Sequence, residues 1–366
     1  MKIAFDHQIF GWQQFGGISR YAYELATGLS KLPNQNVSVI SPLYINQYLT
    51  EAPDSLKVTG ISVPHLPKTG RIYREVNALL AKPIAAFHQP DIVHETYYSR
   101  GSIAPKKAKI VLTVYDMIHE RFKDNFSKAD PTCREKAMAV ARADHIICIS
   151  EQTRADLIQF LNVNPAKTSV VHLGFSLTCS SANQANKSDQ PFLLYVGSRG
   201  GYKNFIGLVK AYASSAFLNK NFKLISFGGG TFTTNEKQLF KELGINSDQI
   251  LQISGDDALL AGYYQSASAF VYPSLYEGFG IPPLEAMSFN CPVVCSNVSS
   301  IPEVVGNAAE MFDPHDFSSI QISIEKVLQD SIYRNKLIEL GKKRLEIFSW
   351  DRCVTDTFSI YQQLSK

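Results

Sequence analysis

Short runs of apolar residues alternate along the chain with longer stretches in which apolar residues recur every three or four positions. The runs have the length of buried strands, and the recurring spacing is typical of one helical face. In the first half, strands are predicted at 2–5, 37–40, 91–94, 110–114, 145–149 and 169–173. In the second half, they are predicted at 192–196, 222–227, 250–253, 269–272 and 292–296. Helices are predicted after Gly16-Gly17 and at 71–87, 133–143, 151–162, 204–215, 235–243, 257–267 and 282–289.

This alternation predicts the fold class and the domain boundaries. Strands that alternate with helices form parallel sheets with right-handed crossovers. The polar, patternless stretch 176–190 predicts a linker. We therefore expect an α/β protein with two tandem Rossmann-like, doubly wound domains, at 1–175 and 191–350, facing a cleft. The periodic C-terminal segment 351–366 is expected to cross back onto the first domain.

Composition narrows the class of protein. With 45% hydrophobic and 19% charged residues among 366, the chain is typical of a globular protein. No apolar run is long enough to span a membrane, and the N-terminus lacks an apolar leader, so a cytoplasmic protein is expected. The six cysteines show no ligand spacing, and we expect neither a metal site nor a disulfide framework.

The net charge of +3 is uneven, because the basic excess lies in the first half. Lys68, Arg71, Arg74 and Lys82 fall on or beside the predicted helix 71–87, and three more lysines lie at 106–109. Such groups attract anionic lipid headgroups or an acidic acceptor. A solvated face is the alternative. Nucleic acid is not an expected partner, since no basic stripe is interleaved with aromatic residues on a recognisable motif.

The most informative motif is Leu-Tyr-Glu-Gly-Phe-Gly-Ile-Pro-Pro-Leu-Glu-Ala at 275–286. A predicted buried strand precedes it, and Pro282 and Pro283 suit the first turn of a helix. Glu277 is therefore expected on a glycine-rich loop and Glu285 in the first helical turn. Two carboxylates for sugar hydroxyls beside a helix N-terminus for phosphate predict a nucleotide-sugar pocket. An ordinary strand–loop–helix with solvated glutamates is the alternative.

Other strand ends carry further candidates. Gly16-Gly17 lets a backbone approach a ligand, although glycines also serve plain turns. Arg199 and Lys203 follow another strand and can reach a phosphate. Asp116 and His119 follow a strand of the first half. No Gly-x-Gly-x-x-Gly dinucleotide motif occurs in either half.

Taken together, these motifs resemble the retaining glycosyltransferases of family 4, which have the GT-B architecture. The resemblance extends over nearly the whole chain. It rests on segment 273–286 with Pro292-Val293-Val294, and on the motifs 16–21, Ser150-Glu151, 171–174, 196–203 and 301–306.

The resemblance implies roles for individual residues. Glu277 would hold the hexose hydroxyls and Glu285 the ribose hydroxyls, while Arg199 and Lys203 would neutralise the diphosphate without a metal or another cofactor. Asp116 and His119 complete the expected catalytic set. His119 is a candidate replacement for a family histidine, because many relatives have His-Asp where this chain has Tyr115-Asp116. The other expected donor-binding residues are Gly16, Gly17, Gly197, Ser254, Gly255, Gly278, Phe279 and Gly280.

The resemblance also suggests substrates. The string Asp6-His7-Gln8-Ile9-Phe10 is similar to that of mannosyl- and rhamnosyltransferases of bacterial surface polysaccharide synthesis. GDP-mannose is therefore the favoured donor, and a saccharide or lipid-linked saccharide the expected acceptor, at the inner face of a membrane. Alternatives are a UDP- or dTDP-sugar donor, a nucleotide-sugar epimerase or phosphorylase on the same architecture, and a silent nucleotide-sugar-binding scaffold. Acceptor contacts are expected on loops around 43–75 and 94–102.

Overall fold

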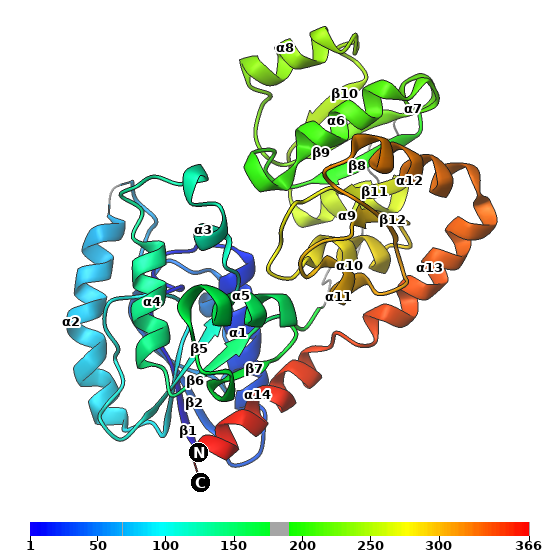
Figure 1. Ribbon diagram of the computed structural model, residues 1–366. Coiled ribbons are helices and arrows are strands. Elements are labelled where there is room, and N and C mark those ends of the chain that lie inside the picture. Colours follow the sequence, from blue (N-terminus) through cyan, green and yellow to red (C-terminus); the bar gives the residue numbers. More distant parts are fainter. Residues whose placement is uncertain (68, 176–189, 366) are drawn as a thin grey trace. The chain divides into compact units, whose positions relative to one another are not determined.

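The computed structural model describes residues 1–67, 69–175 and 190–365 (Figure 1). The chain divides into two compact units. The first comprises Met1–Gly174 with Phe348–Lys366, and the second comprises Phe175–Ile347. Residues 176–189 of the predicted linker lie outside the described residues.

A seven-stranded parallel sheet forms the centre of the first unit, in the order β3-β2-β1-β4-β5-β6-β7. Most of its strands are short, mostly apolar runs, which suits a sheet that is covered on both faces. The strands are β1 (Lys2–Phe5), β2 (Asn36–Tyr44), β3 (Lys57–Ser62), β4 (Ile92–Glu95), β5 (Lys109–Val114), β6 (His145–Cys148) and β7 (Thr168–Val170).

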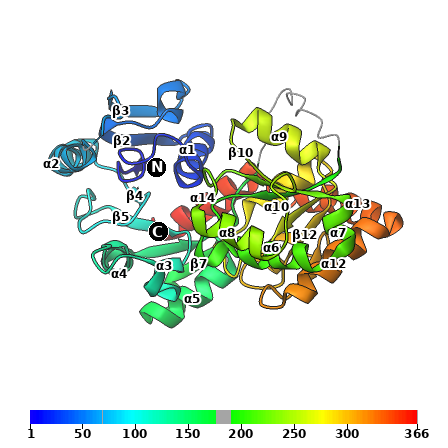
Figure 2. The same cartoon turned by 90° about the horizontal axis from the view of Figure 1, so that it is seen from above.

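Helices cover both faces of this sheet (Figures 1 and 2). They are α1 (Gly17–Ser30), α2 (Gly70–His88), α3 (Ile118–Arg121), α4 (Thr132–Arg142), α5 (Glu151–Leu161) and α14 (Trp350–Leu364), with short 3-10 turns η1 (Tyr48–Glu51), η2 (Lys123–Asn125) and η3 (Pro165–Lys167).

Neighbouring residues of a strand point to opposite faces of the sheet, and this assigns helices to each face. His94 of β4 contacts the Tyr361 hydroxyl, so α14 lies on that face. Val93, the preceding residue, packs with Ala81 and Ala85 of α2 on the opposite face. The C-terminal helix thus belongs to the first unit although the second unit precedes it in the chain.

The second unit contains a six-stranded parallel sheet in the order β10-β9-β8-β11-β12-β13. Its strands are β8 (Phe192–Val196), β9 (Lys223–Phe227), β10 (Ile250–Ile253), β11 (Ala269–Tyr272), β12 (Val293–Ser296) and β13 (Glu310–Phe312). Its helices are α6 (Phe205–Ser214), α7 (Ala216–Asn221), α8 (Thr234–Glu242), α9 (Asp257–Ser266), α10 (Ile281–Ser288), α11 (Ile301–Val305), α12 (Phe317–Gln329) and α13 (Ser331–Leu345), with the 3-10 turn η4 (Gly201–Lys203).

Two doubly wound parallel sheets confirm the predicted fold class. Strands β1, β8, β10 and β11 have the predicted bounds. Strands β3 and β13 were not predicted, because β3 is largely exposed and has no apolar run, and β13 has only three residues. Both are edge strands.

Candidate active site

The carboxyl ends of β8 and β11 bring two predicted residues together. Lys203 ends η4, which follows β8, and Glu277 lies in the loop that follows β11. Lys203 Nζ is 2.8 Å from Glu277 Oε1, and the Glu277 side chain is almost buried. Adjacent strand ends of a parallel sheet are where ligands of doubly wound domains bind. The pair therefore places one cation and one carboxylate at the edge where a nucleotide-sugar is expected.

The Glu277 loop is held by several hydrogen bonds. The backbone N–H of Glu277 donates to Ser299 Oγ (2.9 Å), and the Ser300 hydroxyl contacts the carbonyls of Glu277 (2.9 Å) and Phe279 (2.8 Å). The Leu275 N–H donates to the Tyr202 carbonyl (2.7 Å), which connects this loop to η4. The carboxylate is thus preorganised by two segments, as a catalytic group requires.

Helix α10 begins directly after this loop. Gly280 has a φ of 109°, which only glycine adopts without strain, and two prolines follow in the first turn. Glu285 is the fifth residue of the helix, so it lies in the second turn and not in the first as the sequence predicted. Its Oε2 accepts a hydrogen bond from the Tyr264 hydroxyl (3.0 Å). The carboxylate is therefore fixed on the helix that adjoins Glu277.

Arg199 has partners that the sequence did not predict. Its Nε donates to Glu236 Oε1 (2.7 Å), and its terminal nitrogens donate to the carbonyls of Gly228, Gly230 and Thr231 and to Glu236 Oε2. A guanidinium has five N–H donors, and all five are engaged here. In this arrangement Arg199 holds the glycine-rich loop after β9. The phosphate contacts expected of Arg199 and Lys203 stay predictions.

The remaining predicted residues of the second unit also follow strands. Gly197, with a φ of 128°, directly follows β8, and its N–H donates to the Phe227 carbonyl (2.9 Å). Ser254 and Gly255 are exposed after β10, where Ser254 Oγ accepts a hydrogen bond from the Gln252 side chain (2.7 Å). Gly278 lies in the Glu277 loop. All of these positions are at the carboxyl edge of the sheet.

In the first unit, Gly16 and Gly17 precede and begin α1. A Cβ at Gly16 would meet the end of the flexible Gln13 side chain, which would have to move. A Cβ at Gly17 would meet no atom within 4 Å, and the residue has no left-handed φ. Neither crowding nor strain accounts for Gly17.

Asp116 and His119 lie after β5 but have different surroundings. Asp116 Oδ1 accepts from the Ile118 N–H (3.0 Å), and Lys136 Nζ donates to the Asp116 carbonyl (2.9 Å). His119 stacks on Phe126 and lies 3.8 Å from Asp130. Asp116 is therefore part of an organised strand end, whereas His119 contacts the segment between α3 and α4.

Tyr115 and Lys136 explain how that strand end is built. The buried Tyr115 hydroxyl donates to the Thr96 carbonyl (3.0 Å). Lys136 is fully buried and lies 2.7 Å from Glu120. Sequence analysis did not select Lys136, because a lone lysine in a polar helix has the pattern of a surface residue.

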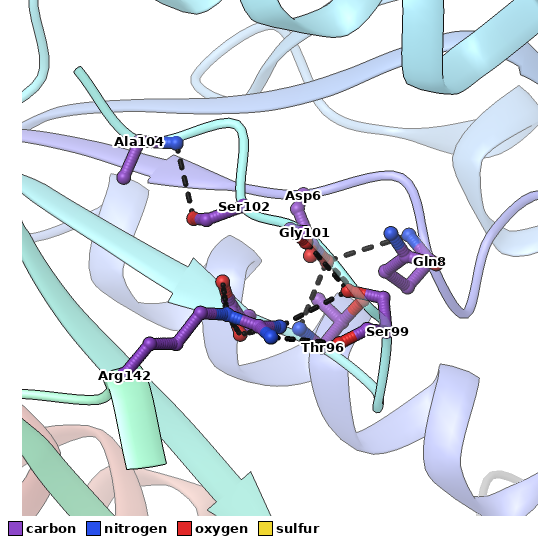
Figure 3. Close-up of polar contacts among 9 residues, drawn as sticks. Asp6, Gln8, Thr96, Ser99, Gly101, Ser102, Ala104 and Arg142 are labelled. Atoms are coloured by element: carbon purple, nitrogen blue, oxygen red, sulfur yellow. Dashed lines mark hydrogen bonds and ion pairs between the residues drawn. The ribbon is translucent and has the colours of Figure 1, made fainter. Parts of the chain in front are cut away.

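A second buried group missed by the sequence analysis lies at the ends of β1 and β4 (Figure 3). Asp6 Oδ1 accepts hydrogen bonds from the Thr96 N–H (2.9 Å) and hydroxyl (2.6 Å). Arg142 forms a two-pronged ion pair with Glu95 and also donates to the Ser99 carbonyl (2.7 Å). Burial, with the nearby Glu95 charge, raises the pKa of Asp6 from 3.8 to about 7. In the sequence, Asp6 and Glu95 each directly follow a predicted strand, and Asp6 also begins the motif 6–10.

Among the residues that the structure describes, no group of three or more His, Cys, Asp or Glu residues could hold a metal ion. No helix among the same residues is long and apolar enough to cross a membrane.

Comparison with known proteins matches two family models. The Glycosyltransferase Family 4 model matches residues 15–178, and the model of glycosyl transferases group 1 matches residues 180–344. Among curated relatives, O-antigen chain mannosyltransferase B of Escherichia coli is 34% identical over 60% of this chain and 60% of its own length. O-antigen chain mannosyltransferase RfbU of Salmonella typhimurium is 25% identical over 87% of this chain and 89% of its own length.

A solved structure with the same fold is sucrose-phosphate synthase from Thermosynechococcus elongatus. It has a TM-score of 0.76 at 19% identity and covers 99% of this chain and 98% of its own. At that identity the likeness concerns the fold alone. The two family models, however, together span both units. The chain belongs to the glycosyltransferases of family 4.

Proposed function

We propose that this protein transfers a hexosyl group from a nucleotide-sugar to a hydroxyl group of a saccharide or lipid-linked saccharide. The observation that carries the proposal is the Lys203–Glu277 pair, 2.8 Å apart at the carboxyl edge of the second sheet. A carboxylate accepts hydrogen bonds from sugar hydroxyls, and an ammonium stabilises a diphosphate as it leaves. Transfer of this kind needs both groups at one place.

Four of the candidate residues have a part in the proposed reaction. Glu277 orients the hexose, and Glu285 on α10 holds the ribose. Lys203 and the N-terminal end of α10 balance the charge that develops on the diphosphate. Gly17 leaves space for the donor to approach the start of α1. In this proposal a side-chain cation meets the leaving group's charge, so EDTA should not reduce turnover.

We further propose GDP-mannose as the donor and retention of the anomeric configuration. Both curated relatives described above are named as O-antigen chain mannosyltransferases, which supports mannose and a role in surface polysaccharide synthesis. Retention follows if the acceptor attacks from the side of the leaving group, as the family resemblance implies. The reaction would then take place in the cytoplasm, at the inner face of the membrane.

Helix α2 supports peripheral contact with that membrane. Asn77, Ala81 and Ala85 face the sheet and are buried. The opposite face of the helix is apolar and exposed, with Leu79 at 74% and Phe87 at 88% exposure. Exposed basic side chains on the same helix, Arg71, Arg74 and Lys82, suit an anionic surface, while Lys68 lies outside the described residues. An amphipathic helix of this composition lies in the lipid interface.

A thermal-shift panel of GDP-, UDP- and dTDP-sugars tests the proposed donor. A ligand at about a hundred times its dissociation constant stabilises the folded state by roughly 2.7 kcal/mol. We expect a clear shift with GDP-mannose, and a smaller one in Lys203→Met. A shift with only a UDP- or dTDP-sugar would show that the proposed donor is wrong, while hexosyl transfer would remain the proposed reaction. No shift with any donor would contradict the proposal. Conversion of donor without acceptor, seen by nuclear magnetic resonance, would indicate an epimerase instead.

A further inference from the structure

Two large aromatic side chains are exposed on the loop between β1 and α1. Trp12 is 62% and Phe15 is 63% exposed, although both are among the residue types that folding usually buries. They lie three positions apart, close to the Gly16-Gly17 turn. Exposed aromatic residues beside a candidate site indicate an interaction surface.

The backbone that carries these rings is firmly held. The Asn46 side-chain amide donates to the Gln13 carbonyl (2.8 Å), and the Gln47 N–H donates to the Gln14 carbonyl (3.1 Å). Within the loop, the Gln13 N–H donates to the Ile9 carbonyl (2.9 Å). The exposure of Trp12 and Phe15 is therefore a feature of an anchored loop. The fold presents them to solvent in defined positions.

Each exposed ring also rests against a tyrosine from another segment. Trp12 lies 5.4 Å, centroid to centroid, from Tyr97, which follows β4. Phe15 lies 5.8 Å from Tyr48 of η1, in an edge-on arrangement. These contacts fix the orientation of both rings and still leave most of their surface open. The two ring pairs together form what we term the aromatic platform, which consists of Trp12, Phe15, Tyr48 and Tyr97.

The chemistry of this surface fits a saccharide. The face of a pyranose carries C–H groups that stack on an aromatic ring, while its hydroxyl groups need polar partners at the rim. Gln14, which lies between Trp12 and Phe15 in the sequence, is exposed and has such a polar group. The apolar face of α2, in contrast, continues along the helix in the way that a lipid surface requires.

We propose that the aromatic platform binds the acceptor saccharide and selects it by stacking on Trp12 and Phe15. This inference rests on the proposed glycosyl transfer and adds the residues that recognise the acceptor. The platform lies at the carboxyl ends of β1 and β4, the edge of the first sheet at which ligands bind. It belongs to the first unit, whereas the Lys203–Glu277 pair belongs to the second. Its loss should therefore affect the acceptor and spare the donor.

Steady-state kinetics of variants test the platform. The acceptor is chosen as the best substrate among methyl glycosides of mannose, rhamnose, glucose, galactose and N-acetylglucosamine, and their disaccharides. We expect Trp12→Ala and Phe15→Ala each to raise the acceptor KM about tenfold, with the donor KM and the thermal midpoint unchanged. Phe317→Ala, which truncates an exposed aromatic residue of the second unit, serves as the matched control and should change neither KM. An unchanged acceptor KM in both platform variants would overturn the inference.

Fluorescence gives an independent measure of binding. The chain has two tryptophans, so a Trp350→Phe variant reports on Trp12 alone. The chosen acceptor, titrated without donor, should change this emission, and emission that stays constant at saturating acceptor would contradict stacking on Trp12. If the wild-type protein transfers from no donor to any glycoside of the panel, the proposed function itself fails. If instead the platform variants are active and their acceptor KM is unchanged, only the inference about the platform fails.

Discussion

Arg199 and Lys203 lie four residues apart, yet their charged groups have different partners. The guanidinium of Arg199 is enclosed by Glu236 and by carbonyls of the glycine-rich loop. The ammonium of Lys203 reaches Glu277 at the edge of the sheet. Removal of a buried cation whose donors are all engaged leaves its acceptors unpaired and destabilises the fold. A cation at a strand end can serve a ligand.

This difference predicts opposite results for two substitutions. Arg199→Met leaves Glu236 and three carbonyls without their donor, and should lower the free energy of unfolding by about 3 kcal/mol. Lys203→Met leaves one carboxylate and no carbonyls without a donor, so it should lower stability less than Arg199→Met. It should reduce kcat about a hundredfold, because charge on the leaving diphosphate loses its partner. Urea unfolding and initial rates measure the two effects. A stable, inactive Arg199 variant would instead assign Arg199 to the reaction.

Asp6 should make stability depend on pH. Its pKa is raised to about 7 in the folded state, against an ordinary value of 3.8. The folded state therefore binds the proton more tightly, so this contribution is complete below about pH 4 and is lost as pH rises through about 7. Asp6→Asn retains an acceptor for Thr96 but does not titrate. Between pH 4 and pH 7 its unfolding free energy should fall less steeply than that of the wild type.

Unfolding by urea at several pH values measures both proteins. Burial lowers the pKa of His7 to about 4, which acts on stability in the opposite direction, but this residue is common to both proteins. The difference between the two curves therefore belongs to Asp6 and its partner Glu95. Parallel curves would show that Asp6 is ionised in the folded state throughout this range.

Single residues were predictable from sequence only in part. Glu277 and Lys203 could be placed together, because both follow apolar runs that had to be strands of one parallel sheet. The partners of Arg199 could not be predicted, because they depend on how the loop after β9 folds back over the Arg199 side chain. Asp6 and Glu95 escaped selection for a similar reason: their burial depends on packing against α4 and on Arg142.

At the scale of elements, the exposed apolar face of α2 predicts that the protein binds a membrane surface. Its inner face packs on β2 and its outer face is apolar. Leu79→Ser with Phe87→Ser should reduce binding to vesicles that contain anionic phospholipid at least tenfold, because apolar side chains insert below the headgroups. Transfer to a water-soluble acceptor should be retained. Cosedimentation with vesicles measures the binding.

A matched control comes from the second unit. Ile332→Ser removes an exposed apolar side chain, 83% exposed, from α13 and should leave vesicle binding unchanged. Binding should also weaken as salt increases, because the basic side chains of α2 contribute attraction that salt screens. Equal binding by wild type and the α2 variant would assign the apolar face to something other than lipid.

Most elements were predictable because their apolar patterns are strong. The periodic positions of α1 and α2 gave helices whose observed bounds differ little from the predicted ones. Edge strand β3 could not be predicted, because its sequence Lys-Val-Thr-Gly-Ile-Ser lacks an apolar run. It becomes a strand by pairing with β2, a contact that the local sequence does not show. Glu285 is the fifth helical residue and not the fourth, because α10 begins at Ile281, one residue before the predicted start.

At the scale of the whole molecule, the two units divide the proposed work. The second unit contains the Lys203–Glu277 pair and Glu285, the groups proposed for the donor. The first unit contains Gly17, the aromatic platform and α2, the features proposed for ligand approach, acceptor and membrane. Helix α14 follows the second unit in the sequence but belongs to the first.

The most direct test of the account is the product formed from GDP-mannose and a mannoside acceptor by the wild type and by Glu277→Gln. Nuclear magnetic resonance should show an α-linked mannose in the wild-type product, the configuration of the donor. Glu277→Gln should be at least about a hundredfold slower at an unchanged thermal midpoint, because the amide no longer holds Lys203 or the hexose as the carboxylate does. Near wild-type turnover by Glu277→Gln would contradict the central claim, and a β-linked product would contradict retention.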